Sequence, residues 1–155
     1  MTTSDAVLSS KVQVSYIDIR VFSHATEDPE RVLTATRSIL PRESIDTVTF
    51  TKANLTGHHG NPIILYETRI KDKKLVQAAF EKLCAGLSLL NKEILANEVR
   101  QHIDKGSLYV RLDKQSAYLN ELKLSPTDPI HLRIHFKKHS AEEVVDICRR
   151  SGLLP

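Results

Sequence analysis

The sequence contains no tryptophan, and aromatic residues account for only 5% of its 155 residues. Such scarcity weakens any model in which rows of aromatic side chains stack against nucleic-acid bases. Long apolar runs are absent as well, and residues 1–10 lack the charged-then-apolar order of a signal peptide. We therefore expect a protein without a membrane-spanning segment and without a secretory leader.

Cysteine is also scarce, since only Cys84 and Cys148 are present. Each lies in an amphipathic segment and has no cysteine nearby, which indicates reduced core residues in a reducing compartment rather than a metal pair. The sequence has no P-loop, no Rossmann fingerprint and no nucleophile elbow. We therefore predict a non-enzymatic protein that has no catalytic residues, no cofactor and no metal ion.

Two residue patterns are candidates for a metal site or a catalytic site. His131, His135 and His139 are spaced at four residues, but on a strand the first two are roughly 13 Å apart, too far to ligate one ion without other elements. Asp18 and Asp113 form a candidate acid–base or Mg²⁺ pair if their strands are neighbours. A solvated sheet face that carries mixed charges accounts for these residues more simply.

The composition that is present describes one ordinary globular domain, with 41% apolar and 26% charged residues. We expect residues 1–10 to form a flexible N-terminus and residues 11–155 to form the single domain. Period-two alternation predicts strands, and apolar spacing of three and four residues predicts helices. The expected strands span residues 11–25, 46–55, 63–70, 108–113 and 131–137, and the expected helices span residues 29–40, 73–87, 91–103 and 141–151.

Capping residues support three of these helices. Asp28 precedes a proline at the start of the first helix, Asp72 precedes the second, and Ser140 with Glu143 forms a capping box before the last. Residues 115–124 are compatible with a short helix, a bulged strand or a loop. The order of elements indicates an α+β fold, in which helices cover one face of a mostly antiparallel sheet.

The stretch from Ser107 to Lys138 concentrates the positive charge of the chain. Between Lys105 and Lys138 there are seven Lys or Arg residues and three acids, a balance of +4, whereas the whole chain carries only +3. In both expected strands of this stretch, apolar residues alternate with polar ones. We predict that one side is buried and consists of Leu108, Val110, Leu112, Leu132, Ile134 and Phe136.

The opposite, mostly basic side is the candidate nucleic-acid-binding surface. Arginine and lysine side chains on a sheet contact phosphates, and histidines hydrogen-bond or stack with bases. Polar residues are also common on any sheet face exposed to water, so this pattern alone leaves both interpretations open. The candidate nucleic-acid-binding residues are Arg111, Arg133 and Lys137, extended by Lys114, Lys138, Arg20 and Arg69, with His131 and His135, and with His58, His59 and Asn61 in a turn whose backbone N–H groups are possible phosphate donors.

Several segments resemble the archaeal RNA-binding protein family known as a predicted exosome subunit. They read IRVFSHATEDPERV, GHHGNPI, and LYVRLDKQSAYLNELKL followed by DPIHLRI, and together they cover most of residues 19–134. The resemblance implies RNA binding, an archaeal cytoplasmic setting, and a fold like that of the ribosomal protein that binds 5S rRNA. Where the family has a glycine, this chain has Asn120, a residue that tolerates left-handed backbone angles.

Two functions therefore remain. The first is a non-enzymatic protein that recognises structured RNA through the basic sheet face, in RNA processing or ribosome biogenesis. The alternative is a protein–protein adaptor subunit of an exosome-like RNA-processing assembly, with exosome or ribosome-related proteins as partners. Salt dependence separates the two, because phosphate contacts release counterions when RNA binds.

Overall fold

A six-stranded antiparallel sheet in the order β2-β3-β1-β6-β5-β4 organises the chain. The computed structural model describes residues 13–138 and 140–155, so the expectation of a flexible segment at residues 1–10 lies outside the described residues. The strands are β1 (Val14–His24), β2 (Thr51–Thr56), β3 (Pro62–Ile70), β4 (Ile103–Asp104), β5 (Ser107–Leu112) and β6 (Ile130–Phe136). The helices in this part of the chain are α2 (Pro29–Arg37), α3 (Lys73–Gly86), α4 (Leu89–Glu98), α5 (Lys114–Tyr118) and α6 (Ala141–Ser151).

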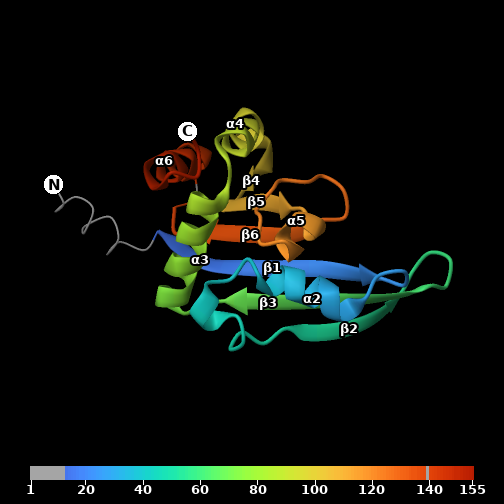
Figure 1. The fold of residues 1–155 in the computed structure, drawn as a ribbon. Coiled ribbons are helices and arrows are strands. Elements are labelled where there is room, and N and C mark those ends of the chain that lie inside the picture. Colours follow the sequence, from blue (N-terminus) through green and yellow to red (C-terminus); the bar gives the residue numbers. More distant parts are fainter. Residues whose placement is uncertain (1–12, 139) are drawn as a thin grey trace.

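Helices cover one face of the sheet, as predicted for an α+β fold. In Figure 1, α2 and α3 lie in front of the central strands, and α5 lies beside the end of β5. The prediction of which side of β5 and β6 is buried is confirmed, because Val110, Leu112, Ile134 and Phe136 are at most 1% exposed. The side of the sheet opposite these residues is called the open face below.

Capping signals located the helix starts correctly. The Asp28 carboxylate accepts a hydrogen bond from the Glu30 N–H, the Asp72 carboxylate from the Leu75 N–H, and the Ser140 hydroxyl from the Glu143 N–H. In the last case the Ser140 hydroxyl also donates to the Glu143 carboxylate. These caps satisfy N–H groups that the first helical turn leaves without partners.

Three expected elements begin or end elsewhere. The helix expected at residues 91–103 is α4, which ends at Glu98 and is followed by a 3-10 turn at residues 99–102 and by β4. The first helix stops at Arg37 rather than at residue 40. The ammonium group of Lys82 donates hydrogen bonds to the carbonyl groups of Ser38 and Leu40, which follow the helix. The second strand starts at Thr51 rather than at residue 46. Arg37 donates to the carbonyl groups of Ile45 and Val48, which draws this segment against α2 instead of the sheet edge.

The undecided segment at residues 115–124 begins as a short helix, α5, that ends at Tyr118 in a Schellman motif. Asn120 has a φ of 62°, as expected for the residue that replaces a glycine. Its N–H donates to the carbonyl of Ala117, and the Glu121 N–H donates to that of Ser116.

Both cysteines are free and buried, as predicted. Burial raises the pKa of the Cys84 thiol to about 11 and that of Cys148 to about 12, so neither forms a thiolate readily. Among the described residues, no helix has the length and apolar character needed to cross a membrane.

Candidate nucleic-acid interface

Four strands place charged and aromatic side chains in two parallel rows across the open face. Residues that face each other in neighbouring antiparallel strands lie side by side on the same face. The first row, from β3 to β5, is Arg69, Asp18, Arg133 and Tyr109. The second row, in the same strand order, is Glu67, Arg20, His131 and Arg111.

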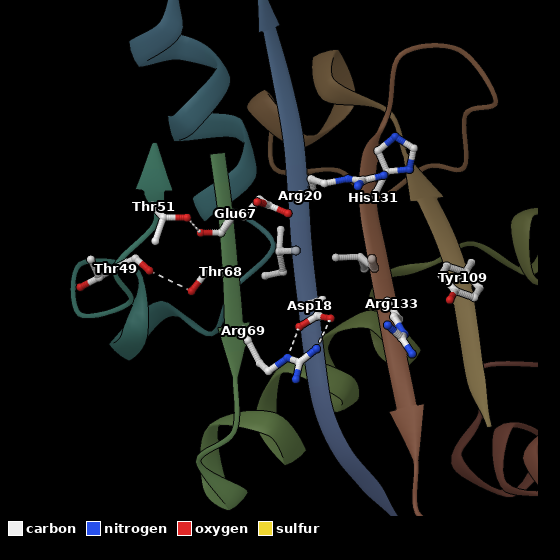
Figure 2. Close-up of a pocket in the computed structure, with 12 residues that line it drawn as sticks. Asp18, Arg20, Thr49, Thr51, Glu67, Thr68, Arg69, Tyr109, His131 and Arg133 are labelled. Carbon is white, nitrogen blue, oxygen red and sulfur yellow. Dashed lines mark hydrogen bonds and ion pairs between the residues drawn. The ribbon is translucent and has the colours of Figure 1, made fainter. Parts of the chain in front are cut away.

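The arginine at the start of the first row is neutralised. The Arg69 guanidinium makes two hydrogen bonds to the Asp18 carboxylate, with Nε–Oδ1 at 2.7 Å and Nη2–Oδ2 at 2.9 Å (Figure 2). The hydrogen bond to Asp18 raises the pKa of Arg69 above its ordinary value. Because a phosphate would have to compete with a carboxylate already bound in this way, Arg69 is the weaker candidate for an RNA contact.

The buried hydroxyl group of Ser107 holds two side chains of the open face, Arg133 and His135. Ser107 is fully buried, and its Oγ lies 2.8 Å from Nδ1 of His135 and accepts a hydrogen bond of 2.9 Å from Nε of Arg133. The His135 ring also stacks on Tyr16, with ring centroids 4.7 Å apart. These contacts orient Arg133 and His135, and the complete burial of Ser107 makes the hydroxyl a positioning group rather than a nucleophile.

The second row contains two arginines that form no ion pair with any described residue. Arg20 and Arg111 are exposed, and among the described residues neither guanidinium forms an ion pair, although Glu67 is the neighbour of Arg20 on β3. His131 lies between them. Burial, together with the charges of Arg20 and Arg111, lowers the pKa of His131. The row is therefore a pair of guanidinium groups on either side of an imidazole whose charged form is disfavoured.

The whole first row and, except for Arg111, the whole second row line a hollow of about 620 Å³ in the open face. Its walls run from Thr49 and Thr51 at one side to Tyr109 at the other, with Arg20, His131 and Arg133 between them (Figure 2). The lining includes three arginines and two carboxylates, Asp18 and Glu67. A broad hollow with this excess of arginine suits an extended anionic ligand better than a small enclosed one.

The structure brings six of the predicted RNA-binding residues onto the open face. They are Arg20, Arg69, Arg111, His131, Arg133 and His135. Lys137 and Lys138 are exposed and directly follow the last residue of β6, next to the same surface. Tyr109 lies on the same face of β5 as Arg111, although it is not among the residues that the sequence predicts to bind RNA.

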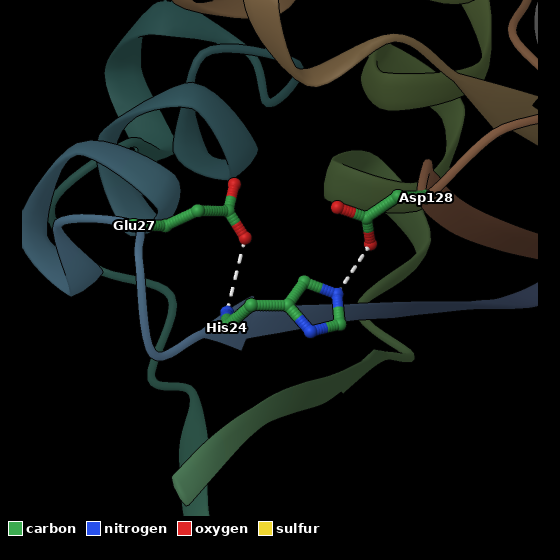
Figure 3. Close-up of side chains that lie close together, drawn as sticks. All are labelled: His24, Glu27 and Asp128. Atoms are coloured by element: carbon green, nitrogen blue, oxygen red, sulfur yellow. Dashed lines mark hydrogen bonds and ion pairs between the residues drawn. The ribbon is translucent and has the colours of Figure 1, made fainter. Parts of the chain in front are cut away.

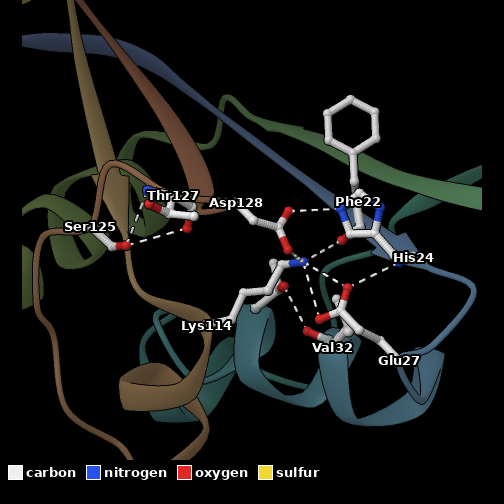
Figure 4. A network of polar contacts seen from close by, with 9 residues as sticks. Phe22, His24, Glu27, Val32, Lys114, Ser125, Thr127 and Asp128 are labelled. Atoms are coloured by element: carbon white, nitrogen blue, oxygen red, sulfur yellow. Dashed lines mark hydrogen bonds and ion pairs between the residues drawn. The ribbon is translucent and has the colours of Figure 1, made fainter. Parts of the chain in front are cut away.

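Lys114 does not extend this surface, which corrects the expectation from the sequence. Only 12% of its side chain is exposed. Its ammonium group donates to the Phe22 carbonyl at 2.6 Å, to Glu27 at 3.0 Å and to Asp128 at 2.8 Å (Figure 4). All of its donors are thus engaged, and the residue ties β1, the start of α2 and the segment before β6 together.

The turn between β2 and β3 does not offer the row of backbone donors expected from its glycines. The Gly57 N–H donates to the Asn61 carbonyl, the Gly60 N–H to the Gly57 carbonyl, and the His59 N–H to the Asn61 side chain. His58 and His59 are exposed at the tip of this hairpin, away from the residues that line the hollow. Their role in RNA binding stays a prediction.

One cluster of acceptors in the described residues has the spacing of a metal site. Ligand atoms of His24, Glu27 and Asp128 all lie within 4.8 Å of one another (Figure 3). The Lys114 ammonium, however, contacts both carboxylates, and His24 Nε2 bonds to Asp128 Oδ1 at 2.9 Å. The lysine supplies the positive charge that an ion would bring, so the geometry favours a structural cluster.

The carboxylate pair considered from the sequence does not form. Strand β6 lies between β1 and β5, so Asp18 and Asp113 are not on neighbouring strands. Asp113 instead caps α5, where its carboxylate accepts a hydrogen bond of 2.8 Å from the Ser116 N–H. The acid–base or Mg²⁺ hypothesis for these two residues is therefore wrong.

Comparisons with known proteins agree on one family and one fold. Residues 16–136 match the family model described as RNA binding. A protein of Pyrococcus abyssi named as an RNA-binding protein is 39% identical over 133 residues, which are 84% of this chain and 86% of that protein.

Solved structures of archaeal proteins show the same fold. A protein of Archaeoglobus fulgidus superposes with a TM-score of 0.76 at 24% identity, over 90% of this chain and 99% of that one. A DUF54 protein of Methanothermobacter thermautotrophicus has a TM-score of 0.73 at 26% identity, over 92% of this chain and 99% of that one.

Proposed function

Since the chain belongs to the RNA-binding family, we propose that it is a non-enzymatic protein that binds structured RNA through the open face of its sheet. The observation that carries this proposal is the second row, in which Arg20 and Arg111 lie on either side of His131 without a carboxylate partner. Two guanidinium groups held on rigid strands on either side of β6 are suited to phosphate oxygens. Arg133, held by Ser107, extends the same surface.

The relative strength of the contacts follows from their partners. Arg20 and Arg111 form no ion pair with any described residue, whereas Arg69 forms an ion pair with Asp18. Lys137 and Lys138 are exposed at the end of β6 and supply additional charge at the border of the surface. RNA would therefore contact chiefly the side of the open face formed by β1, β6 and β5.

The test is an RNA titration at two salt concentrations with the double variant Arg20→Ala, Arg111→Ala. We expect a loss of about 2–4 kcal/mol in binding free energy, because charge-assisted hydrogen bonds contribute about 1.5–3 kcal/mol each before exposure is discounted. The slope of log K against log salt should fall by roughly 1.5–2 units, since two phosphate contacts are lost.

A matched control keeps the change in net charge and moves it away from the open face. Arg42 and Arg149 are exposed and lie on the turn after α2 and on α6, so Arg42→Ala, Arg149→Ala should bind RNA with nearly the original slope. The proposal is contradicted if the two double variants behave alike, or if the unaltered protein binds no RNA at low salt.

A second candidate function, as an adaptor subunit, is favoured by one feature of α4. Leu89 and Leu90 are 64% and 65% exposed, and Ile94 is 42% exposed, an apolar surface typical of protein contacts. Crosslinking in native cells tests it: Leu90→Ser should remove crosslinked proteins and leave RNA affinity intact, whereas unchanged protein crosslinks would contradict the adaptor role. Exosome or ribosome-related partners and a cytoplasmic setting stay predictions from the family resemblance.

A further inference from the structure

Tyr109 is a large aromatic side chain exposed on the open face. It is 37% exposed although it lies in the middle of β5, and it lines the hollow beside Arg133 (Figure 2). Tyrosine in such a position usually covers a neighbour or finds a partner, because an exposed ring leaves apolar surface in water. Among the described residues, the contact of this ring is with the Arg133 guanidinium, 5.9 Å from the ring centroid.

The other aromatic rings of this face, those of Tyr16 and Phe22, are less exposed than the ring of Tyr109. Tyr16 contacts the stacked His135 ring at 4.7 Å and the Arg69 guanidinium at 3.9 Å. Phe22 is half-buried and has the Arg20 guanidinium 5.7 Å from its centroid. Tyr109 therefore offers the ring surface best placed to receive a flat ligand.

The ring lies next to the unneutralised charges. Tyr109 and Arg111 are two residues apart on β5 and point to the same face, which separates them by about 7 Å along the strand. Arg111 and Arg20 are separated by two strand spacings, about 10 Å, with His131 between them. At these distances, one nucleotide can contact both the Tyr109 ring and the Arg111 guanidinium. The phosphate of the next nucleotide can then contact the second row.

We infer that the RNA segment on the open face is unpaired, that one of its bases stacks on Tyr109, and that its phosphates lie along Arg111, His131 and Arg20. This inference rests on the proposed function. In an A-form duplex the base faces are stacked on one another, so no base face is accessible to an aromatic ring that projects from a sheet. Loops and single strands expose their bases, and aromatic rings and arginine planes bind them. The scarcity of aromatic residues limits the stack to about one base.

The experiment compares three labelled RNAs by fluorescence anisotropy. These are a single-stranded oligonucleotide of mixed sequence, the same oligonucleotide annealed to its complement, and a hairpin that contains it as the loop. We expect the single strand and the hairpin to bind more tightly than the duplex. Tyr109→Leu should weaken binding of the single strand by about 5- to 100-fold, the loss associated with one stacked base, and should leave duplex binding unchanged.

Two variants control for indirect effects. Tyr109→Phe retains the ring and should retain most of the affinity, which distinguishes stacking from a hydrogen bond of the hydroxyl group. Tyr118→Leu removes another exposed tyrosine, 41% exposed on α5, and should bind like the unaltered protein. Thermal unfolding confirms that each variant is folded.

The outcomes separate the inference from the proposed function. If the duplex binds as tightly as the single strand, or if Tyr109→Leu binds the single strand normally while Arg20→Ala, Arg111→Ala loses affinity, the inference of an unpaired segment is wrong and RNA binding by the second row stands. If the unaltered protein binds none of the three RNAs at low salt, the proposed function itself fails.

Discussion

Lys114 shows at the scale of a single residue how context decides the role of a charge. It lies in the most basic part of the sequence, yet its ammonium group is held by the Phe22 carbonyl, Glu27 and Asp128. Burial raises the pKa of Asp128, but hydrogen bonds from Lys114 and His24 outweigh this effect and lower it. Asp128 also has a φ of 43°, a left-handed conformation that these contacts help to maintain.

We predict that Lys114→Met lowers the free energy of unfolding by roughly 2 kcal/mol. Breaking a buried ion pair typically costs about 3–5 kcal/mol, and partial exposure of the carboxylates reduces this. The salt slope of RNA binding should stay unchanged, unlike that of Arg20→Ala, Arg111→Ala. Urea unfolding and RNA titration of the same preparation check both statements. A normal stability with a smaller salt slope would restore Lys114 to the RNA-binding surface.

The same variant has a defined pH dependence. The pKa of Asp128 in the folded protein lies below the ordinary value of 3.8, so its contribution to stability is present above that pH and is lost as the pH falls through the folded pKa. The difference in stability between the unaltered protein and Lys114→Met should therefore be largest above pH 4 and shrink below it. Lys123→Met, which removes an exposed lysine from the segment after α5, serves as the control.

At the scale of an element, the end of α5 is set by one residue. Asn120, at φ 62°, occupies the left-handed position of the Schellman motif, where its N–H and that of Glu121 satisfy the carbonyl groups of Ala117 and Ser116. Asparagine tolerates this conformation better than residues with bulkier or apolar side chains, and glycine adopts it without strain.

We predict that Asn120→Gly leaves stability unchanged or raises it slightly, and that Asn120→Ala lowers the free energy of unfolding by about 1 kcal/mol, because alanine pays the full steric cost of a left-handed backbone. Chemical denaturation of both variants gives the measurement. Equal destabilisation by glycine and alanine would show that the asparagine side chain, rather than its backbone angle, stabilises the turn.

At the scale of the whole molecule, folding assembles the second row from three distant segments. Arg20 comes from β1, Arg111 from β5 and His131 from β6. Burial and the charges of Arg20, Arg111 and Lys114 lower the pKa of His131, while Asp128 opposes this effect. A phosphate bound between the two arginines would favour the protonated imidazole and raise that pKa.

RNA binding should therefore take up a proton at His131, and affinity should rise as the pH falls from about 7.5 towards 5.5, the range in which histidine titrates. His131→Asn should flatten this rise, although other histidines can leave a residual slope. Titrations at several pH values and constant ionic strength check the prediction. An identical pH profile for the variant would place the phosphates away from His131.

Much of the architecture was predictable because its signals are local. Alternation along β1, β5 and β6 separates the buried side from the open face, since each of these strands has one side against the helices. Asp28, Asp72 and Ser140 mark helix starts through bonds to N–H groups two or three residues away. The start of β2 was not predictable, because it depends on hydrogen bonds from a more distant residue. Arg37 donates to the carbonyl groups of Ile45 and Val48, which are eight and eleven residues later in the chain.

The sequence by itself determined the α+β class, the order of the longer strands and helices, and the face of the sheet that carries Arg20, Arg111, His131 and Arg133. These follow from side-chain periodicity and capping, which act within a few residues along the chain. Only the tertiary structure decided which charges remain available. Strand order pairs Arg69 with Asp18 and keeps Asp113 apart from them, and Lys114 meets acids 87 and 14 residues away. Ion pairing depends on distances in space, and the sequence does not contain these before the strands are ordered.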